Sequence, residues 1–157
     1  MHAELAREAP KNVKVLRLGA NRPDRRYAIL SNDDGPVLAV ELRAEFTLHE
    51  EVLLWRDWLV IGFANFVHLV RLDTHGSAGI FLDAQFVALH PLEDVLLVAS
   101  TDRIRAVKAD GLTAWTSAPL RNGTKILSIH DGVIEGEGFT LSLATGKESL
   151  VAQQRPE

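Results

Sequence analysis

The side chains best suited to chemistry in this sequence are six histidines, since imidazole binds metals and transfers protons near neutral pH. His49 precedes two glutamates, as at the start of a zinc-protease helix, but no second histidine follows four residues later. His90 and His130 begin corresponding turns of two internal repeats, so repeat symmetry would bring them, with Asp131, toward one end of the molecule. The chain has no cysteine, which excludes thiol catalysis, disulfides and Cys-based zinc sites. We therefore expect no bound metal and no cofactor.

Acidic side chains occur in adjacent pairs, including Glu50-Glu51 and Glu93-Asp94, and paired carboxylates can act as a general acid and base. These pairs lie between apolar runs, where turns are expected and acidic residues are common without a catalytic role. No serine has the Gly-x-Ser-x-Gly pattern of a nucleophile elbow. The segment Gly136 to Gly138 encloses a glutamate, which would repel phosphate. The sequence therefore predicts a protein that is not an enzyme.

Composition and charge favour a folded chain that binds another protein. Of 157 residues, 46% are hydrophobic and 24% charged, which fits one globular domain. There are 17 Lys and Arg residues against 21 Asp and Glu residues, and this net charge of −4 makes general nucleic-acid binding unlikely. Basic clusters at Arg22 to Arg26 and at Arg103, Arg105 and Lys108 are interpreted as solvated charges on edge strands.

Two further patterns concern the compartment of the protein. No window approaches the ~20 apolar residues of a membrane span, so no membrane partner is predicted. The segment Met1 to Pro10 is charged and lacks the apolar core of a secretory signal. We therefore expect a cytoplasmic protein.

Strands must position all of these side chains. Short runs rich in Val, Leu, Ile and Phe recur, and the Gly, Asp, Asn and Pro clusters between them are too short for crossover helices. The pattern predicts an antiparallel, all-β domain over residues 13–152. An N-terminal tail (1–12) and a C-terminal tail (153–157) flank it, and Ala3 to Glu8 has a composition that suits a helical turn.

Internal repeats organise the predicted strands. Three similar stretches begin near Trp58, Val95 and Val133, at nearly even spacing, and each follows another apolar strand and a turn. A shorter fourth copy runs from Tyr27 to Leu42. About four copies of a four-stranded unit with a period of ~40 residues are typical of propeller blades.

The segment Ala106 to Trp115 resembles the repeat of pyrroloquinoline-quinone-type β-propellers, in which a strand ends in Asp, a Gly closes the turn and a Trp follows. Leu72 to Gly76 and Leu143 to Lys147 are similar, and the resemblance extends over about Val52 to Leu150. It implies a propeller-like stack of about four short four-stranded units, without the quinone or calcium sites of that family. A β-sandwich and a curved barrel are the alternatives.

A cluster of aromatic side chains between Phe46 and Phe66 is the best candidate for a binding surface. With neighbouring acidic turns it predicts a surface for a basic partner, made of Glu50, Glu51, Trp58, Phe66, Glu93 and Asp94. The leading hypothesis is a non-enzymatic protein-binding module, most concretely a small acidic immunity protein that inhibits a toxin or nuclease domain by covering it. One alternative is a propeller-like ligand-binding or catalytic domain with its site near His90 and His130. A second alternative is a fragment whose ring is completed by another copy in a homodimer.

Overall fold

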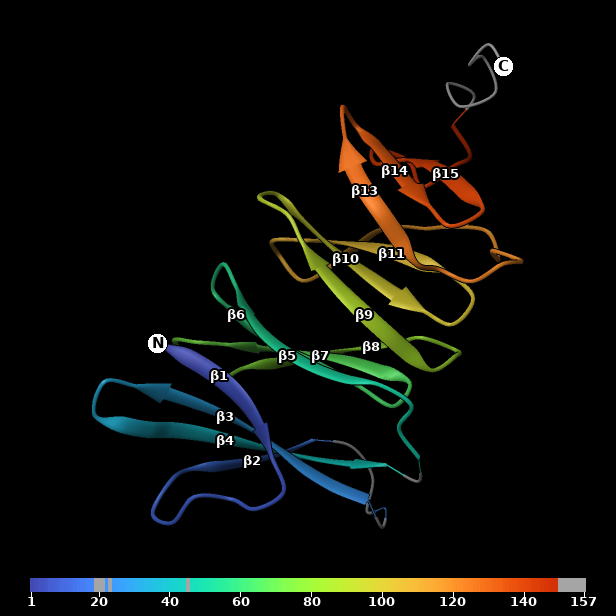
Figure 1. Ribbon diagram of the computed structural model, residues 1–157. Coiled ribbons are helices and arrows are strands. Elements are labelled where there is room, and N and C mark those ends of the chain that lie inside the picture. Colours follow the sequence, from blue (N-terminus) through green and yellow to red (C-terminus); the bar gives the residue numbers. More distant parts are fainter. Residues whose placement is uncertain (19–21, 23, 45, 150–157) are drawn as a thin grey trace. The chain divides into compact units, whose positions relative to one another are not determined.

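The computed structural model describes residues 1–18, 22, 24–44 and 46–149 (Figure 1). These residues form fifteen strands joined by turns, and no helix occurs among them. The strands form four separate sheets, and none of the four closes on itself. The prediction of an all-β chain is confirmed.

The first sheet has the order β1-β3-β4-β2. It contains β1 (His2–Ala6), β2 (Val15–Leu18), β3 (Asp24–Asn32) and β4 (Gly35–Ala44). The hairpin of β3 and β4 is antiparallel, as predicted, but β2 runs parallel to β4. The reason is that β1 and β2 occupy opposite edges of the sheet and run in the same direction, so the chain between them crosses over instead of forming a hairpin.

The helical turn predicted within the N-terminal tail is wrong. Strand β1 pairs with β3 over its whole length, from His2 opposite Ser31 to Ala6 opposite Tyr27. Ala3 and Leu5 alternate along the strand and pack against the buried core. Pairing with a neighbouring strand therefore overrides the helix propensity of this short segment.

The second sheet is a four-stranded meander in the order β5-β6-β7-β8. Its strands are β5 (Glu50–Trp55), β6 (Trp58–Phe63), β7 (Phe66–Arg71) and β8 (Ser77–Phe81). Two-residue turns connect the first three strands, and Arg56 and Ala64 begin them with φ angles of 51° and 55°. All six residues of β6 are buried, as expected for a central strand covered on both faces.

The first two sheets share one hydrophobic core, built mainly from β3, β4, β6 and β7. Leu30, Leu38 and Leu42 from the first sheet pack with Leu59 and Ile61 from the second. The alternating apolar residues that predicted these strands therefore also form the contact between the sheets.

The third sheet has the order β12-β11-β10-β9 and the fourth the order β13-β14-β15. The third contains β9 (Phe86–Pro91), β10 (Val95–Ser100), β11 (Ile104–Lys108) and β12 (Thr113–Thr116). The fourth contains β13 (Ile126–His130), β14 (Val133–Gly136) and β15 (Phe139–Ser142). A single bridge between Leu141 and Glu148 follows β15, and residues 150–152 of the predicted domain lie outside the described residues.

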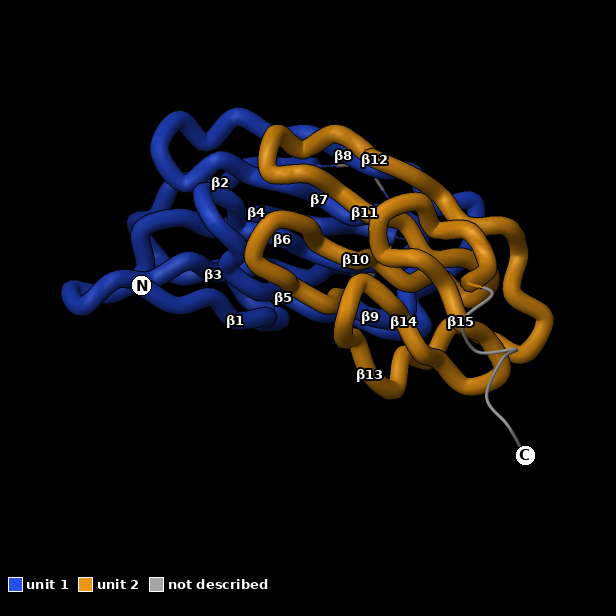
Figure 2. The backbone as a smooth tube through the Cα atoms, turned by 90° about the horizontal axis from the view of Figure 1, so that it is seen from above, with its two compact units in different colours: residues 1–88 blue, residues 89–157 orange. Residues whose placement is uncertain are grey.

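The sheets correspond to the predicted repeats. Each of the last three sheets begins at the apolar strand that precedes a repeat copy, at Glu50, Phe86 and Ile126, and the shorter copy forms β3 and β4. The chain nevertheless divides into two compact units, residues 1–88 and 89–157, where the sequence predicted one repeat domain (Figure 2). The predicted C-terminal tail, residues 153–157, lies outside the described residues. Among the described residues, there is no helix of the length and apolar character that a membrane span requires.

Candidate functional site

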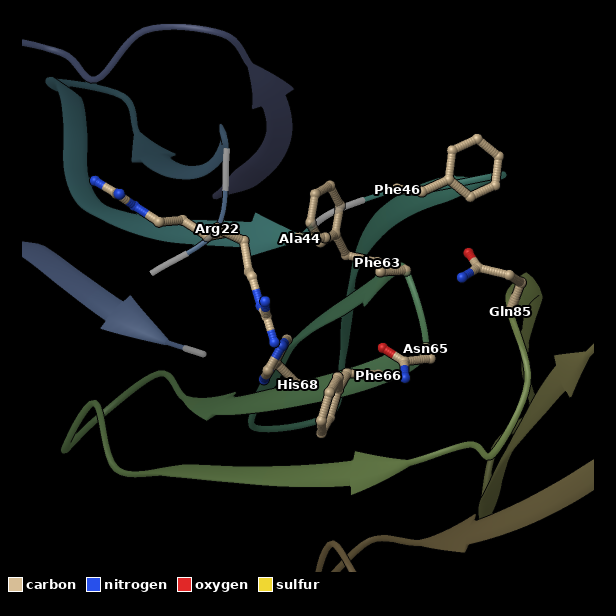
Figure 3. Close-up of a pocket in the computed structure, with 10 residues that line it drawn as sticks. Arg22, Ala44, Phe46, Phe63, Asn65, Phe66, His68 and Gln85 are labelled. Carbon is tan, nitrogen blue, oxygen red and sulfur yellow. The ribbon is translucent and has the colours of Figure 1, made fainter. Parts of the chain in front are cut away.

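A cleft of about 470 Å³ opens in the first compact unit, where β4 and β6 end and β7 begins (Figure 3). Ala44, Phe63 and Ala64 form its floor, and all three are at least 93% buried, since their exposed fractions are 7%, 2% and 5%. The remaining lining residues surround this apolar floor: Arg22, Arg43, Phe46, Asn65, Phe66, His68 and Gln85. They come from segments that are far apart in the sequence.

Backbone hydrogen bonds fix the β6–β7 turn that forms one wall of the cleft. The backbone N–H of Ala64 donates to Thr47 Oγ1 at 3.1 Å. The carbonyl of Ala64 accepts from the N–H of Phe86 at 2.6 Å. Next to these bonds, the N–H of Leu48 donates to Gln85 Oε1 at 3.3 Å. The β6–β7 turn, the segment after β4 and the segment before β9 are therefore tied to one another.

Strand β7 contributes an aromatic wall. Phe66 and His68 lie on one face of the strand, and their rings stack at 5.6 Å between centroids with planes 14° apart. Phe81, the cross-strand partner of Phe66 on β8, contacts the Phe66 ring in a tilted arrangement, at 5.3 Å between ring centroids. Burial lowers the pKa of His68 to about 4, so its imidazole is neutral at pH 7.

Polar side chains of the cleft have unused hydrogen-bonding capacity. Within the described part of the chain, neither the His68 ring nor the Asn65 amide has a hydrogen-bond partner. Figure 3 shows Arg22 and His68 toward one end of the cleft and Phe46 and Gln85 toward the other. A ligand in the cleft would therefore meet an arginine and an imidazole toward one end, and an aromatic ring and a side-chain amide toward the other.

Beside the cleft, three arginines and a tyrosine surround the carboxylate of Glu41, and we call this group the Glu41 cluster. The strand register places Arg17 and Tyr27 directly opposite Glu41, on β2 and β3. Tyr27 donates its hydroxyl to Glu41 Oε1 at 3.1 Å, and Arg17 Nε lies 3.4 Å from Oε2. Arg43 contacts both carboxylate oxygens of Glu41, through Nε and Nη2, at 3.4 Å each. Arg25 Nε lies 3.5 Å from Oε1.

Two opposing effects act on Glu41, which is only 4% exposed. Burial raises the pKa of its carboxyl, but hydrogen bonds from Arg43 and Tyr27 and the charges of Arg43 and Arg25 lower it further than burial raises it. The carboxylate is therefore ionised at neutral pH. Three guanidinium groups thus face this one carboxylate, and Arg43 extends from the cluster to the lining of the cleft.

The predicted binding residues of the first unit have different environments. Phe66 is 37% exposed and lines the cleft. Trp58 is only 5% exposed, and the guanidinium of Arg71 lies over its ring at 4.4 Å, so its indole is not part of an exposed surface. It is covered because both faces of β6 are buried. Glu50 pairs with Arg26 at 3.4 Å, and Glu51 is half-buried.

Glu93 and Asp94, the other predicted binding residues, are exposed in the turn before β10 of the second unit. His130 is also exposed, and its Nε2 lies 4.0 Å from Glu135 Oε1 of the same sheet. His90 is half-buried at the end of β9. No group of three or more potential metal ligands occurs among the residues that the structure describes.

The second predicted basic cluster is dispersed. Arg105 is buried with 6% exposure, whereas Arg103 and Lys108 pair with Asp102 and Asp110 at 3.6 Å each. The first predicted cluster does contribute to the site, through Arg22 at the cleft and Arg25 in the Glu41 cluster.

Several cleft residues were not predicted, notably Arg43, Asn65 and Gln85. Of these residues, only Arg43 could have been predicted from the sequence. It lies two positions after Glu41 in the same strand, so the two side chains are on the same face. The others are brought together by contacts between strands.

The cleft offers an apolar floor, stacking rings, amides and cations, which are groups that bind and orient a ligand. No protein-family model matches the sequence, and comparison with curated proteins finds no significant match.

Proposed function

We propose that this protein is a non-enzymatic protein-binding module and that its partner docks at the cleft of residues 1–88. The observation that supports this most is the distribution of exposed aromatic rings. Phe46, Phe66 and Phe81 are 59%, 37% and 52% exposed, and they are the exposed aromatic residues of the described chain. All three lie in or beside the cleft.

Leu48, which is 50% exposed, extends this apolar surface through its backbone bond to Gln85. Exposed aromatic side chains beside arginines are typical of the residues that contribute most to protein–protein binding energy. Large apolar side chains gathered at one concave place are also uncommon on proteins that act alone. The immunity or inhibitor protein predicted from size and charge is the most concrete form of this proposal.

The proposal can be tested by comparing two double variants in affinity capture from native lysate. In the cleft variant, Phe46 and Phe66 become serine, and in the control, Leu112 and Leu127 of the second unit become serine. The control residues are both 62% exposed, so the control also replaces two exposed apolar side chains by serine, but in the second unit. We expect a stoichiometric partner with wild type and control and a recovery at least tenfold lower with the cleft variant.

A partner retained equally by the cleft variant would contradict the proposed site. Circular dichroism and thermal unfolding of both variants would verify that a lost partner does not reflect a lost fold.

A further inference from the structure

Strand β8 forms one edge of the second sheet, next to β7. Four of its five residues are exposed, and Ile80 is half-buried. At one end of β8, the N–H of Arg71 donates to the carbonyl of Gly76 at 2.8 Å. At the other end, the N–H of Leu82 donates to the carbonyl of Asn65 at 2.9 Å. Both bonds continue the uninterrupted antiparallel register of β7 and β8, and they therefore fix the direction of the backbone groups in β8.

Three residues of β8 direct their backbone polar groups to the outside of the sheet. Hydrogen-bonded pairs alternate with non-bonded pairs along an antiparallel ladder. Counting from the two flanking bonds, Ser77, Gly79 and Phe81 belong to the non-bonded pairs. Among the residues that the structure describes, the N–H and C=O groups of these three residues have no hydrogen-bond partner. A row of such groups along an extended edge is complementary to one further strand.

The other edges of the described sheets have features that discourage strand pairing. Three of these edges carry a charged side chain, at Glu4 of β1, Arg17 of β2 and Glu50 of β5. Strand β9 ends at Pro91, β12 and β13 pair with their neighbours through register shifts, and β15 is bridged to Glu148. Strand β8 has no charged residue, no proline and no register shift. Its edge is therefore accessible to a partner strand.

Gly79 lies at the centre of this edge, where packing within the described chain does not require a glycine. Its φ is outside the left-handed region, and a Cβ at this position would meet His68 Nδ1 at an ordinary contact distance of 3.8 Å. At Gly62 of β6, in contrast, the Phe86 ring occupies the place of a side chain. A glycine inside a strand weakens the strand and often marks a place where another chain approaches closely. Gly79 therefore indicates a contact outside this chain.

The space beside Gly79 lies on the face of the aromatic wall. Gly79 is the cross-strand partner of His68, and Phe81 is that of Phe66, so all four residues share one face of the sheet. A residue opposite Gly79 on an added strand would place its side chain beside the rings of His68 and Phe81. An aromatic or large aliphatic side chain covers a glycine on a neighbouring strand in this way.

A second copy of this chain fits the edge less well, because two-fold symmetry restricts the register. When Ser77, Gly79 and Phe81 all pair with the same residues of a second copy, Gly79 lies opposite Gly79. No side chain then lies directly opposite either glycine. A strand of different sequence can bond to all three residues and also place a large side chain opposite Gly79.

We infer that β8 binds an extended, uncharged segment of the partner protein as a further strand of the second sheet, with an aromatic or large aliphatic residue opposite Gly79. This inference rests on the proposed function, because Phe66 and Phe81 belong both to the exposed aromatic surface and to the face on which that residue lies. Main-chain hydrogen bonds supply the affinity, and the residue opposite Gly79 supplies the specificity.

A random dodecapeptide display library, selected on the full chain, tests this inference without knowledge of the partner. Enriched peptides are synthesised and N-methylated at one backbone position at a time, because each methyl group removes one N–H donor. Their binding is compared on wild type, Gly79→Ala and Phe66→Ser. The control is Ser128→Ala, which changes an exposed residue of an edge strand in the second unit.

We expect N-methylation to weaken binding by about tenfold or more at every second position of the peptide and to have little effect at the positions between. The reason is that only alternate residues of an added strand direct their N–H groups to β8. Gly79→Ala should weaken binding of these peptides by about tenfold, because its methyl group fills the space of the large side chain. Ser128→Ala should bind like wild type. Thermal unfolding of Gly79→Ala should match wild type, since the added Cβ has room within the chain.

The alternatives give different results. Peptides that require Phe66 but tolerate N-methylation at every position would overturn strand pairing and leave the proposed function standing. No enrichment, or peptides indifferent to both Phe66→Ser and Gly79→Ala, would contradict both. Ser77→Pro removes an outward N–H without removing a bond to β7. A wild-type dimer in sedimentation velocity that becomes a monomer in Ser77→Pro would overturn the inference in favour of a second copy.

Discussion

Trp115 packs directly over Gly146, at the place where a side chain on that glycine would have to lie. The indole Nε1–H of Trp115 also donates to the carbonyl of Leu143 at 2.9 Å, three residues before the glycine. Trp115 belongs to β12 and Gly146 to the turn after β15, so this contact connects the two sheets of the second unit. The tryptophan that carries the sequence resemblance therefore has a structural role.

Gly146→Ala should destabilise the protein by more than the cost of its backbone conformation. The φ of Gly146 is 71°, and an alanine in this left-handed region costs about 1–2 kcal/mol. The added methyl must also displace the Trp115 ring, and overpacking adds about 1–3 kcal/mol. Urea unfolding measures the difference in free energy of unfolding.

Gly132→Ala is the matched control, because Gly132 has a φ of 74° and open space where a side chain would lie. It should show the backbone cost alone. Equal losses for the two variants would show that the Trp115 contact does not limit this position.

Glu41→Gln should lower the free energy of unfolding at neutral pH by about 1–3 kcal/mol, since it removes the charge that three arginines share. Because the folded pKa of Glu41 is lowered, its stabilisation is present above the unfolded pKa and disappears as pH falls through the folded pKa. The difference in free energy of unfolding between wild type and Glu41→Gln, measured by urea unfolding, should therefore become smaller at acidic pH.

Glu137→Gln provides the comparison for Glu41→Gln. Glu137 forms an exposed ion pair with Lys125 at 3.8 Å, and such surface pairs contribute little to stability. Glu137→Gln should therefore lower the free energy of unfolding by less than about 1 kcal/mol. A Glu41→Gln protein as stable as the Glu137→Gln protein at pH 7 would refute the importance of the Glu41 cluster.

His68 should make stability depend on pH between about 6.5 and 4. Burial lowers its folded pKa to about 4 from 6.5, so the unfolded chain binds more protons in this range. Stability should thus fall as pH decreases, by up to about 3 kcal/mol, and the effect should be absent above pH 7.5. His68→Gln should flatten this slope in urea unfolding measured at several pH values.

His49→Gln, which changes an exposed histidine, should retain the wild-type slope. A slope unchanged in His68→Gln would mean that other groups cause the acid sensitivity.

The Phe46 and Phe66 variants should affect binding without affecting the fold. Both rings are substantially exposed, so serine at either position should change the free energy of unfolding by less than about 1 kcal/mol. Phe63→Ala, in the floor of the same cleft, should cost about 3–5 kcal/mol because Phe63 is 2% exposed. Thermal unfolding of the three proteins separates surface residues from core residues, and a large loss for Phe66→Ser would place Phe66 in the core.

Local patterns in the sequence were sufficient to predict the strands and their repetition. Alternating apolar residues and turn residues are local signals, and they predicted repeat copies beginning near Trp58, Val95 and Val133, where strands β6, β10 and β14 begin. Local composition failed at His2–Ala6, because pairing with β3 outweighs the weak helix propensity of five residues.

The site, in contrast, depends on contacts between segments that are distant in the sequence. Residues 22, 43, 66 and 85 meet at one cleft only because β4, β7 and the segment before β9 are folded together. The tertiary structure also decided that Trp58 is covered while Phe66 is exposed, since period-two alternation does not reveal whether both faces of a strand are buried. The Glu41 cluster likewise depends on strand register, which is set by long-range pairing of β2, β3 and β4. Strand formation is local in this chain, whereas burial and the convergence of charges are properties of the packed sheets.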